Sequence, residues 1–298
     1  MLNNPRVLAV SSLGSTAKSF YELVKFRLSF LVAFSCGFGY VLGSGGTLNW
    51  IHLGWLCLGG FLVSGASITI NQIIEKDLDK LMTRTMNRPL PTGKLTVRQA
   101  MLFSIVLAAI GLSILMLFTN TLTTLLSLLS MVLYSFVYTP LKRVGPIAVF
   151  VGAIPGALPP LLGWTAYTGS ITYEALIIFG IQFIWQFPHF WAIAWVADED
   201  YKKAGFKLLP SGGTKDLNTA IQIMIYTLFL IPLGLLPAKF GITGIDSAII
   251  VTVCGVLFLS QTFALMKNGN RKSALRIMFG SFLYLPIVQI AYLLDMVK

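Results

Sequence analysis

Nine long apolar runs decide what this chain can fold into. They cover approximately residues 25–44, 52–74, 99–118, 120–138, 144–165, 172–196, 218–238, 245–266 and 275–295. A helix needs about 20 mostly apolar residues to cross the hydrocarbon core of a bilayer. A soluble domain of 298 residues could not bury a chain that is 56% hydrophobic and only 11% charged. We therefore predict an all-α fold, a polytopic transmembrane helical bundle of about nine spans that forms a single membrane-embedded domain over residues 1–298.

Basic residues fall on alternate connections between these runs. Every lysine and arginine except Lys239 and Lys298 lies within residues 1–27, 75–98, 142–143, 202–215 or 267–276. With nine spans all these segments face one side, which the positive-inside rule assigns to the cytoplasm. We therefore expect a cytoplasmic N-terminus, in the cell inner (plasma) membrane. The net charge of +11 then reflects membrane orientation and an anionic substrate, and we expect no nucleic acid partner.

Three oxygen-bearing side chains follow the second run at helical spacing. Asn71, Glu75 and Asp79 stand four residues apart, so on a helix they form a ladder down one face, whereas Asp77 points roughly the other way. Hard cations such as Mg²⁺ prefer oxygen ligands and usually share them with a substrate phosphate. The ladder predicts a metal site, and the alternative is a solvated helix end with ion pairs to neighbouring lysines.

Arginines follow the ladder directly. Arg84 and Arg88 are again four apart, and the prolines and glycine before Lys94 force a shaped loop. Guanidinium groups bind diphosphate oxygens in pairs, although simple ion pairs with the nearby acids are the alternative. Lys142 and Arg143, after the fourth run, add positive charge on the same side.

A second acidic cluster follows the sixth run. Asp198, Glu199 and Asp200 are adjacent and precede Tyr201, on a side of the membrane where basic residues dominate. We expect Glu199 and Asp200 to contribute to a second metal site, against the alternative of an ordinary charged loop.

The sixth run contains polar residues, and the fifth is unusually rich in Gly and Pro. Trp185, Gln186 and His189 surround Pro188 in the sixth, and an ionisable residue inside a membrane segment indicates function, with a hydrogen bond to a neighbouring helix as the alternative. The fifth run is so rich in Gly and Pro that we expect a broken or bent helix. Beside Tyr138 such a helix would open space for a bulky flat substrate, whereas close helix packing is the other use of small residues.

Taken together, these motifs resemble the intramembrane aromatic prenyltransferase superfamily. Its signature, an Asn-x-x-x-Asp-x-x-x-Asp ladder followed by Arg-Thr-x-Asn-Arg-Pro-Leu, matches residues 71–90. Within the superfamily the chain is similar to the haem O synthases, which are protohaem IX farnesyltransferases. The matching segments are Tyr138-Thr-Pro-Leu-Lys142-Arg143, Gly156-Ala-Leu-Pro159 with Gly163-Trp164, Trp185-Gln-Phe-Pro188-His189-Phe190, and Glu199-Asp200-Tyr201 followed by Ala204-Gly205.

The resemblance implies transfer of a farnesyl group from farnesyl diphosphate to the vinyl group of protohaem IX (haem b), giving haem O and diphosphate in haem biosynthesis for cytochrome oxidase. It implies Mg²⁺ as cofactor, haem b as substrate, the lipid bilayer as surroundings, and a downstream haem-modifying enzyme or cytochrome oxidase assembly as partner. Haem O carries a hydroxyl beside the new bond, so water must reach the site.

The resemblance also assigns roles to single residues. The catalytic set would be Asn71, Glu75, Asp79, Arg84, Arg88, Lys142 and Arg143, and the metal ligands would be Asn71, Glu75, Asp79, Glu199 and Asp200. The substrate-binding set would be Lys94, Tyr138, Trp185, Gln186, His189 and Tyr201. His189 would bind the haem iron or move a proton.

Two departures and two rivals qualify this interpretation. Glu75 stands where the superfamily most often has Asp, and Ala197 and Tyr201 stand where quinone-pathway relatives have a pair of Asp. A quinone-pathway prenyltransferase would share the ladder but does not predict the Trp-Gln-x-Pro-His segment. A transporter would also have broken helices, but its charged groups belong near the bilayer midplane.

Overall fold

The computed structural model describes residues 5–297, with side chains from residue 14 onward; Lys298 and the side chain of Arg6 lie outside this part. Within it, nine helices are long and apolar enough to cross a membrane. They are α2 (Phe26–Gly43), α3 (Trp50–Ile74), α5 (Val97–Phe118), α6 (Thr121–Val132), α8 (Ile147–Thr168), α9 (Tyr173–Val196), α12 (Leu217–Gly234), α14 (Ile245–Asn268) and α15 (Arg271–Leu294). The fourth span continues through a π-helical turn, η1 (Leu133–Tyr138), and α7 (Thr139–Leu141), and the seventh continues into α13 (Leu236–Lys239). The predicted all-α bundle of nine spans is confirmed.

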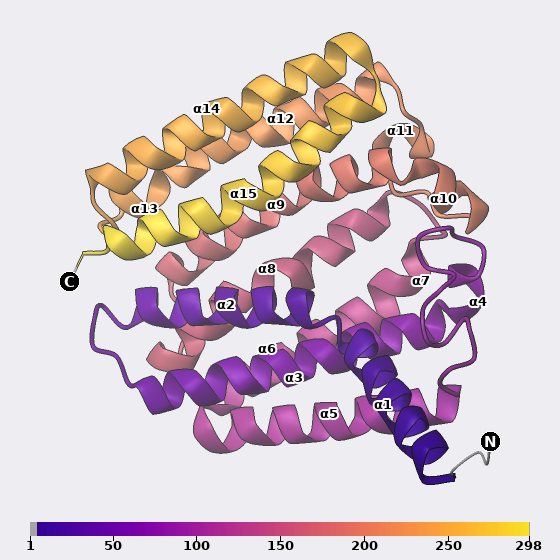
Figure 1. Cartoon of the computed structure of the whole chain (residues 1–298). Helices are drawn as coiled ribbons and strands as arrows, with labels where there is room; N and C mark the ends of the chain where they lie inside the picture. Colours follow the sequence, from indigo (N-terminus) through magenta and orange to yellow (C-terminus); the bar gives the residue numbers. More distant parts are fainter. Residues whose placement is uncertain (1–4, 298) are drawn as a thin grey trace.

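Helix α1 (Pro5–Val24) precedes the first span. Short helices lie in the connections between spans: α4 (Lys76–Asp79), α10 (Asp198–Lys203) and α11 (Pro210–Gly213). Figure 1 shows α4, α7, α10 and α11 gathered at one end of the bundle. Helix α1 begins at that same end, and α15 ends at the opposite one. The segments that carry the predicted chemistry therefore meet at a single end.

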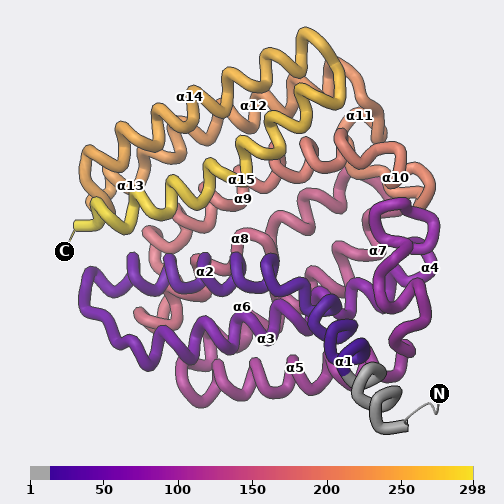
Figure 2. Tube along the Cα trace, viewed as in Figure 1, coloured from indigo at the N-terminus to yellow at the C-terminus, as the bar shows by residue number. Residues whose placement is uncertain are grey.

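The chain runs back and forth between the two ends of the bundle, as the trace in Figure 2 shows. Helix α8 packs against α2, α6 and α9, and α9 packs in turn against α12 and α15. Helices α3 and α5 pair on one flank, while α14 packs against α12 and α15 on the other. Helices α8 and α9 therefore lie inside the bundle, where their polar side chains have protein neighbours instead of lipid.

Of the expected broken or bent helix in the fifth span, the break is wrong, because α8 runs without interruption through Pro155, Pro159 and Pro160; the bend stays a prediction. Each proline leaves the carbonyl four residues earlier without its helical donor. Side chains from neighbouring helices replace two of these donors. Ser130 donates to the Pro155 carbonyl at 3.5 Å, and two glutamines of α9 donate to the Gly156 carbonyl. Replacement of lost backbone bonds by neighbours is what allows proline inside a membrane helix.

Small residues bring α2 and α8 into backbone contact. A Cβ atom at Gly163 would overlap the carbonyl oxygen of Cys36, and one at Gly39 would overlap the carbonyl oxygen of Pro160. Close packing, the alternative use of small residues, therefore applies at this helix pair.

Candidate active site

The predicted ladder of Asn71, Glu75 and Asp79 forms at the end of α3. The helix ends at Ile74 and α4 begins at Lys76, with Glu75 between them. The Glu75 amide nevertheless donates to the Asn71 carbonyl at 2.9 Å, and the Asp79 amide donates to the Glu75 carbonyl at 2.7 Å. Because these bonds keep the four-residue step, all three side chains stay on one face. All three are buried, with Glu75 4% and Asp79 0% exposed.

Each carboxylate of the ladder has a basic partner from another segment. Arg88 Nη1 lies 2.7 Å from Asp79 Oδ2, and Lys142 Nζ lies 2.8 Å from Glu75 Oε1. Burial by itself would lower the pKa of Lys142, but attraction to Glu75 outweighs it, so the pKa is raised. Lys142 is therefore fully charged at neutral pH. The buried acids and their basic partners form one compact group at the end of the bundle.

One oxygen of the ladder has no partner. Asp79 Oδ1 is buried and accepts no hydrogen bond in the described structure. Asn71 uses its Nδ2 to donate to Thr139 Oγ1 at 3.0 Å, which turns its amide oxygen away from that bond. No cluster of three or more His, Cys, Asp or Glu residues among those described could hold a metal unaided. The ladder thus fits a Mg²⁺ ion only if amide and substrate oxygens complete the ligand set.

Asp200 accepts hydrogen bonds from backbone amides of the loop between α4 and α5, which carries Arg84 and Arg88. The amides of Thr83 and Arg84 donate to its two carboxylate oxygens at 3.1 and 3.0 Å. These bonds, with that of Arg84 the largest contribution, lower the pKa of Asp200 to about 2, and Lys203 Nζ adds a contact at 3.1 Å. Asp200 therefore holds the loop between α4 and α5 against α10. Glu199 is exposed. The assignment of both as metal ligands stays a prediction.

Lys25 also belongs to this basic group. In the sequence, only its position directly before the first span indicated that it could lie near the site. Its backbone is left-handed, with φ 47°, where α1 ends and α2 begins. Burial lowers the pKa of Lys25 to about 7, and repulsion from Arg88 and Lys142 adds to the effect. Positive charges thus crowd this region beyond what the two ladder acids neutralise, and such a site favours an anion.

Four other predicted residues are less buried than the ladder. Lys94 and Arg143 are exposed, as is the side chain of Arg84. Tyr201 is half-buried and packs against Phe206, with ring centroids 5.7 Å apart. Of the predicted residues, the structure gathers Asn71, Glu75, Asp79, Arg88, Lys142 and Tyr138.

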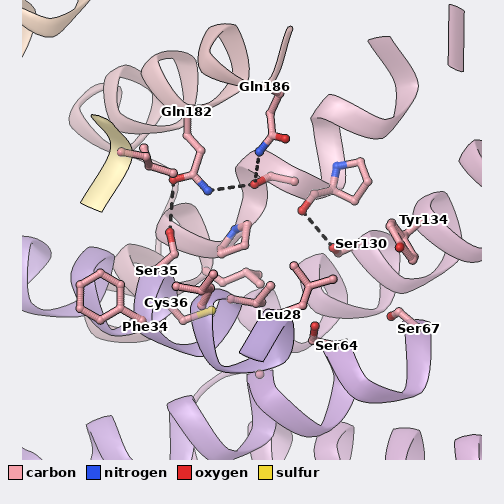
Figure 3. A pocket seen from close by; sticks show the side chains of 18 of the residues that line it. Leu28, Phe34, Ser35, Cys36, Ser64, Ser67, Ser130, Tyr134, Gln182 and Gln186 are labelled. Carbon is pink, nitrogen blue, oxygen red and sulfur yellow. Dashed lines mark hydrogen bonds between the residues drawn. The ribbon is translucent and has the colours of Figure 1, made fainter. Parts of the chain in front are cut away.

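A cavity of about 370 Å³ lies next to the ladder, between α2, α3, α6, η1, α8, α9 and α15 (Figure 3). Its lining is mostly apolar and contains no Asp, Glu, Lys or Arg among the described residues. The π-helical turn places Tyr134 and Tyr138 in the wall, with ring centroids 5.5 Å apart. Lys142 Nζ lies 4.7 Å from the centroid of the Tyr138 ring, so Tyr138 connects the cavity to the charged group. A substrate with an anionic head and an apolar tail fits this arrangement.

Helix α9 presents the predicted Trp185, Gln186 and His189 to the same cavity. The rings of Trp185 and His189 stack with centroids 4.4 Å apart. His189 Nδ1 lies 2.9 Å from Ser281 Oγ, and Trp185 Nε1 donates to the Ser281 carbonyl at 3.1 Å. Pro188 does not interrupt the helix. The wall therefore combines flat rings with fixed polar groups.

Comparison with known proteins decides the family. The model of the UbiA prenyltransferase family matches residues 32–285. The chain belongs to this family. It is 53% identical over 283 residues to the protoheme IX farnesyltransferase of Cytophaga hutchinsonii, covering 95% of this chain and 99% of that relative. It is 43% identical over 299 residues to the one of Christiangramia forsetii, covering 99% and 98%. These relatives confirm the resemblance to haem O synthases.

Solved structures of UbiA relatives share the fold. The chain matches a digeranylgeranylglyceryl phosphate synthase with a TM-score of 0.78 at 22% identity, covering 94% of this chain and 98% of the other. It matches a UbiA homologue from Archaeoglobus fulgidus bound to DMAPP and Mg²⁺ with a TM-score of 0.66 at 18% identity, covering 92% and 99%. The chain is a multi-pass membrane protein of the UbiA fold.

Proposed function

We propose that this chain is a protohaem IX farnesyltransferase, which transfers the farnesyl group of farnesyl diphosphate to a vinyl group of haem b and forms haem O and diphosphate. The observation that carries the proposal is the buried acid ladder with its basic partners, set beside an apolar cavity whose α9 wall bears Trp185 and His189. The similarity to relatives named protoheme IX farnesyltransferase supports haem as the acceptor.

The diphosphate would bind at the charged end. Asn71, Glu75 and Asp79 would hold Mg²⁺, which lowers the energy of the departing diphosphate by neutralising its charge. Arg88 and Lys142 already contact the carboxylates of Asp79 and Glu75, so they would also contact the oxygens of a diphosphate bound at that metal. Arg84, Arg143 and Lys94 would act from the exposed rim, and Glu199 and Asp200 are proposed as further metal ligands.

The farnesyl chain would lie in the cavity, where apolar walls keep an allylic cation from bulk water. Tyr138 would lie where the head of the substrate meets its tail, because it contacts both Lys142 and the cavity. The porphyrin would bind along α9, with Trp185 and Gln186 as contacts. Tyr201 packs against Phe206, whose ring centroid lies 5.6 Å from Lys142 Nζ, and it would close the charged end.

We further propose that the charged end faces the cytoplasm of a cell whose inner membrane holds the protein. The distribution of Lys and Arg supports this orientation, since the connections at that end carry nearly all of them. Haem O released there would pass to a downstream haem-modifying enzyme or to cytochrome oxidase assembly.

A competition between acceptors tests the function. Protein in liposomes is given farnesyl diphosphate, Mg²⁺ and equal amounts of haem b and an aromatic quinone precursor, and the products are identified by mass. Farnesylated haem as the main product is expected. A farnesylated quinone precursor would favour the quinone-pathway alternative, and recovery of both acceptors unchanged would refute transferase activity.

A further inference from the structure

A chain of buried amides crosses the cavity wall between α2, α9 and α15. Gln182 Oε1 accepts from Ser35 Oγ at 3.2 Å and from Gln289 Nε2 at 3.0 Å. Gln289 Nε2 also lies 3.0 Å from Ser35 Oγ. Gln182 and Gln186 both donate from Nε2 to the Gly156 carbonyl, at 2.8 and 3.0 Å (Figure 3). These side chains line a mostly apolar cavity. Burying an amide costs free energy unless its polar atoms are hydrogen-bonded, so an amide atom left without a partner here calls for one.

Proline chemistry fixes which way the Gln186 amide faces. Pro160 has no N–H, so the Gly156 carbonyl has no helical donor and accepts from the two glutamines instead. Because a carbonyl only accepts, the nitrogen of Gln186 must face it, and the amide oxygen must turn away. Figure 3 shows that oxygen directed away from the bond. No hydrogen-bond partner for it is found in the described part of the chain, and Gln186 lines the cavity.

A single hydroxyl proton fixes the tautomer of His189. Ser281 Oγ donates to the Met278 carbonyl at 2.7 Å, which uses its only hydrogen. Toward His189 Nδ1, 2.9 Å away, Ser281 can therefore only accept, so Nδ1 carries the proton. The lone pair of Nε2 is then free to act as a base. His189 also lines the cavity, where no carboxylate is found among the described lining residues.

We propose that Gln186 Oε1 and His189 Nε2 hold the water molecule that becomes the hydroxyl of haem O. This inference rests on the proposed function. Gln186 and His189 lie three residues apart on α9 and both face the cavity, so they present two acceptors to the two hydrogens of one water. A buried water needs two or more such polar partners, and the rest of the cavity is mostly apolar.

The reaction balances with these groups. The bond between farnesyl C1 and oxygen breaks, and diphosphate leaves with the electron pair. The vinyl π electrons form the new carbon–carbon bond from the terminal vinyl carbon, which leaves a cation on the carbon next to the porphyrin ring. The water oxygen adds to that carbon, and the proton it releases goes to His189 Nε2. Gln186 keeps the oxygen lone pair of the water aimed at the cation by holding one of its hydrogens.

The product ratio reports on this water. A cation that water does not reach in time loses a proton instead, giving a farnesylated haem lighter by one water. We expect Gln186→Leu to lower the ratio of hydroxylated to dehydrated product by about 2- to 10-fold, the value of one hydrogen bond. The ratio is measured within the farnesylated haem that forms, so weaker haem binding in this variant lowers both products together and leaves the ratio unaffected. Gln261→Leu, a matched change on α14 outside the cavity, should leave the ratio unchanged.

Two more variants keep the test decisive if Gln186→Leu folds poorly. In Gly156→Ala the new Cβ would lie 2.7 to 2.9 Å from the Gln186 amide and displace it, so the ratio should fall in the same direction. His189→Ala should lower the ratio without shifting the Soret band of bound haem. A wild-type ratio in both Gln186→Leu and Gly156→Ala would overturn the proposal. A shifted Soret band in His189→Ala would overturn it too, because Nε2 would then bind iron. Absence of farnesylated haem in wild type would instead refute the proposed function.

Discussion

Arg88→Lys tests whether the guanidinium group of this residue binds substrate or only balances a charge. Arg88 donates one N–H to Asp79 Oδ2 at 2.7 Å, and its side chain is 17% exposed. A guanidinium has five N–H donors in one plane, so several remain for diphosphate oxygens. Lysine at this position keeps the charge and the pairing with Asp79, but it lacks the planar fork.

The size of the effect follows from the bonds lost. A hydrogen bond to a charged group contributes about 1.5–3 kcal/mol, and loss of one such bond weakens binding by roughly 10- to 100-fold. The partial exposure of Arg88 favours the lower half of this range, because water replaces part of the lost contact. We therefore expect farnesyl diphosphate to bind roughly 10- to 30-fold more weakly to Arg88→Lys.

Titration calorimetry in detergent with Mg²⁺ measures this affinity, and inorganic diphosphate titrated in parallel isolates the contribution of the head group. The matched control is Arg98→Lys, an exposed arginine at the start of α5 that should bind both ligands as wild type does. Equal affinity in Arg88→Lys and wild type would show that Arg88 serves only as the counterion of Asp79, and the assignment of the diphosphate site would fail.

Three further changes test other parts of the account. Asp79→Ala should lower turnover by about a thousandfold or more while the protein still folds in detergent. The control Asp77→Ala changes an exposed side chain and should stay active. Near-normal activity of Asp79→Ala would show that the ladder does not bind the metal. Lys25 is mostly neutral at pH 8 because its pKa is lowered to about 7, so diphosphate binding should raise that pKa, take up protons and weaken as the pH rises from 7 to 9. Calorimetry in two buffers of different ionisation enthalpy measures this uptake, and an unchanged uptake in Lys25→Gln would contradict it. Gly163→Ala should lower the melting temperature, with a cost of about 1–3 kcal/mol for overpacking, while Gly180→Ala, with open space around it, should not; equal melting temperatures would mean that α2 and α8 can separate freely.

The number and order of the spans could be predicted from sequence because both depend on local composition. Twenty apolar residues need a bilayer wherever they occur, and the alternation of basic connections fixes the count independently. Some helix ends are also determined locally. Asn120 caps the start of α6 by accepting from the Thr123 amide at 2.9 Å, so the fourth span begins directly after the third.

The continuity of α8 could not be predicted, because the remedy for its prolines comes from elsewhere in the chain. The donors to the Gly156 carbonyl are Gln182 and Gln186, which lie 26 and 30 residues further along. Proline by itself argues for a break, and only the packed neighbour supplies the missing hydrogen bonds. The sequence therefore predicts which backbone hydrogen bonds are lost but not which side chains replace them.

The ladder itself could be predicted, because its three residues are four apart on one helix. The partners of its carboxylates could not be predicted. Lys142 follows Glu75 by 67 residues, and Asp200 reaches the amide of Arg84 across 116. The sequence places Asp200 on the same side of the membrane as the ladder, but it does not show that the amides of Thr83 and Arg84 donate to its two carboxylate oxygens. Such long-range partners become visible only in the tertiary fold.

The most direct test of the central claim is the mass of the haem recovered from liposomes that contain the purified protein, after incubation with haem b, farnesyl diphosphate and Mg²⁺. The account predicts haem b plus one farnesyl group and one hydroxyl. It also predicts that this product disappears when EDTA replaces Mg²⁺ and when Asp79→Ala replaces wild type. Haem b recovered with unchanged mass from the complete wild-type reaction would contradict the claim.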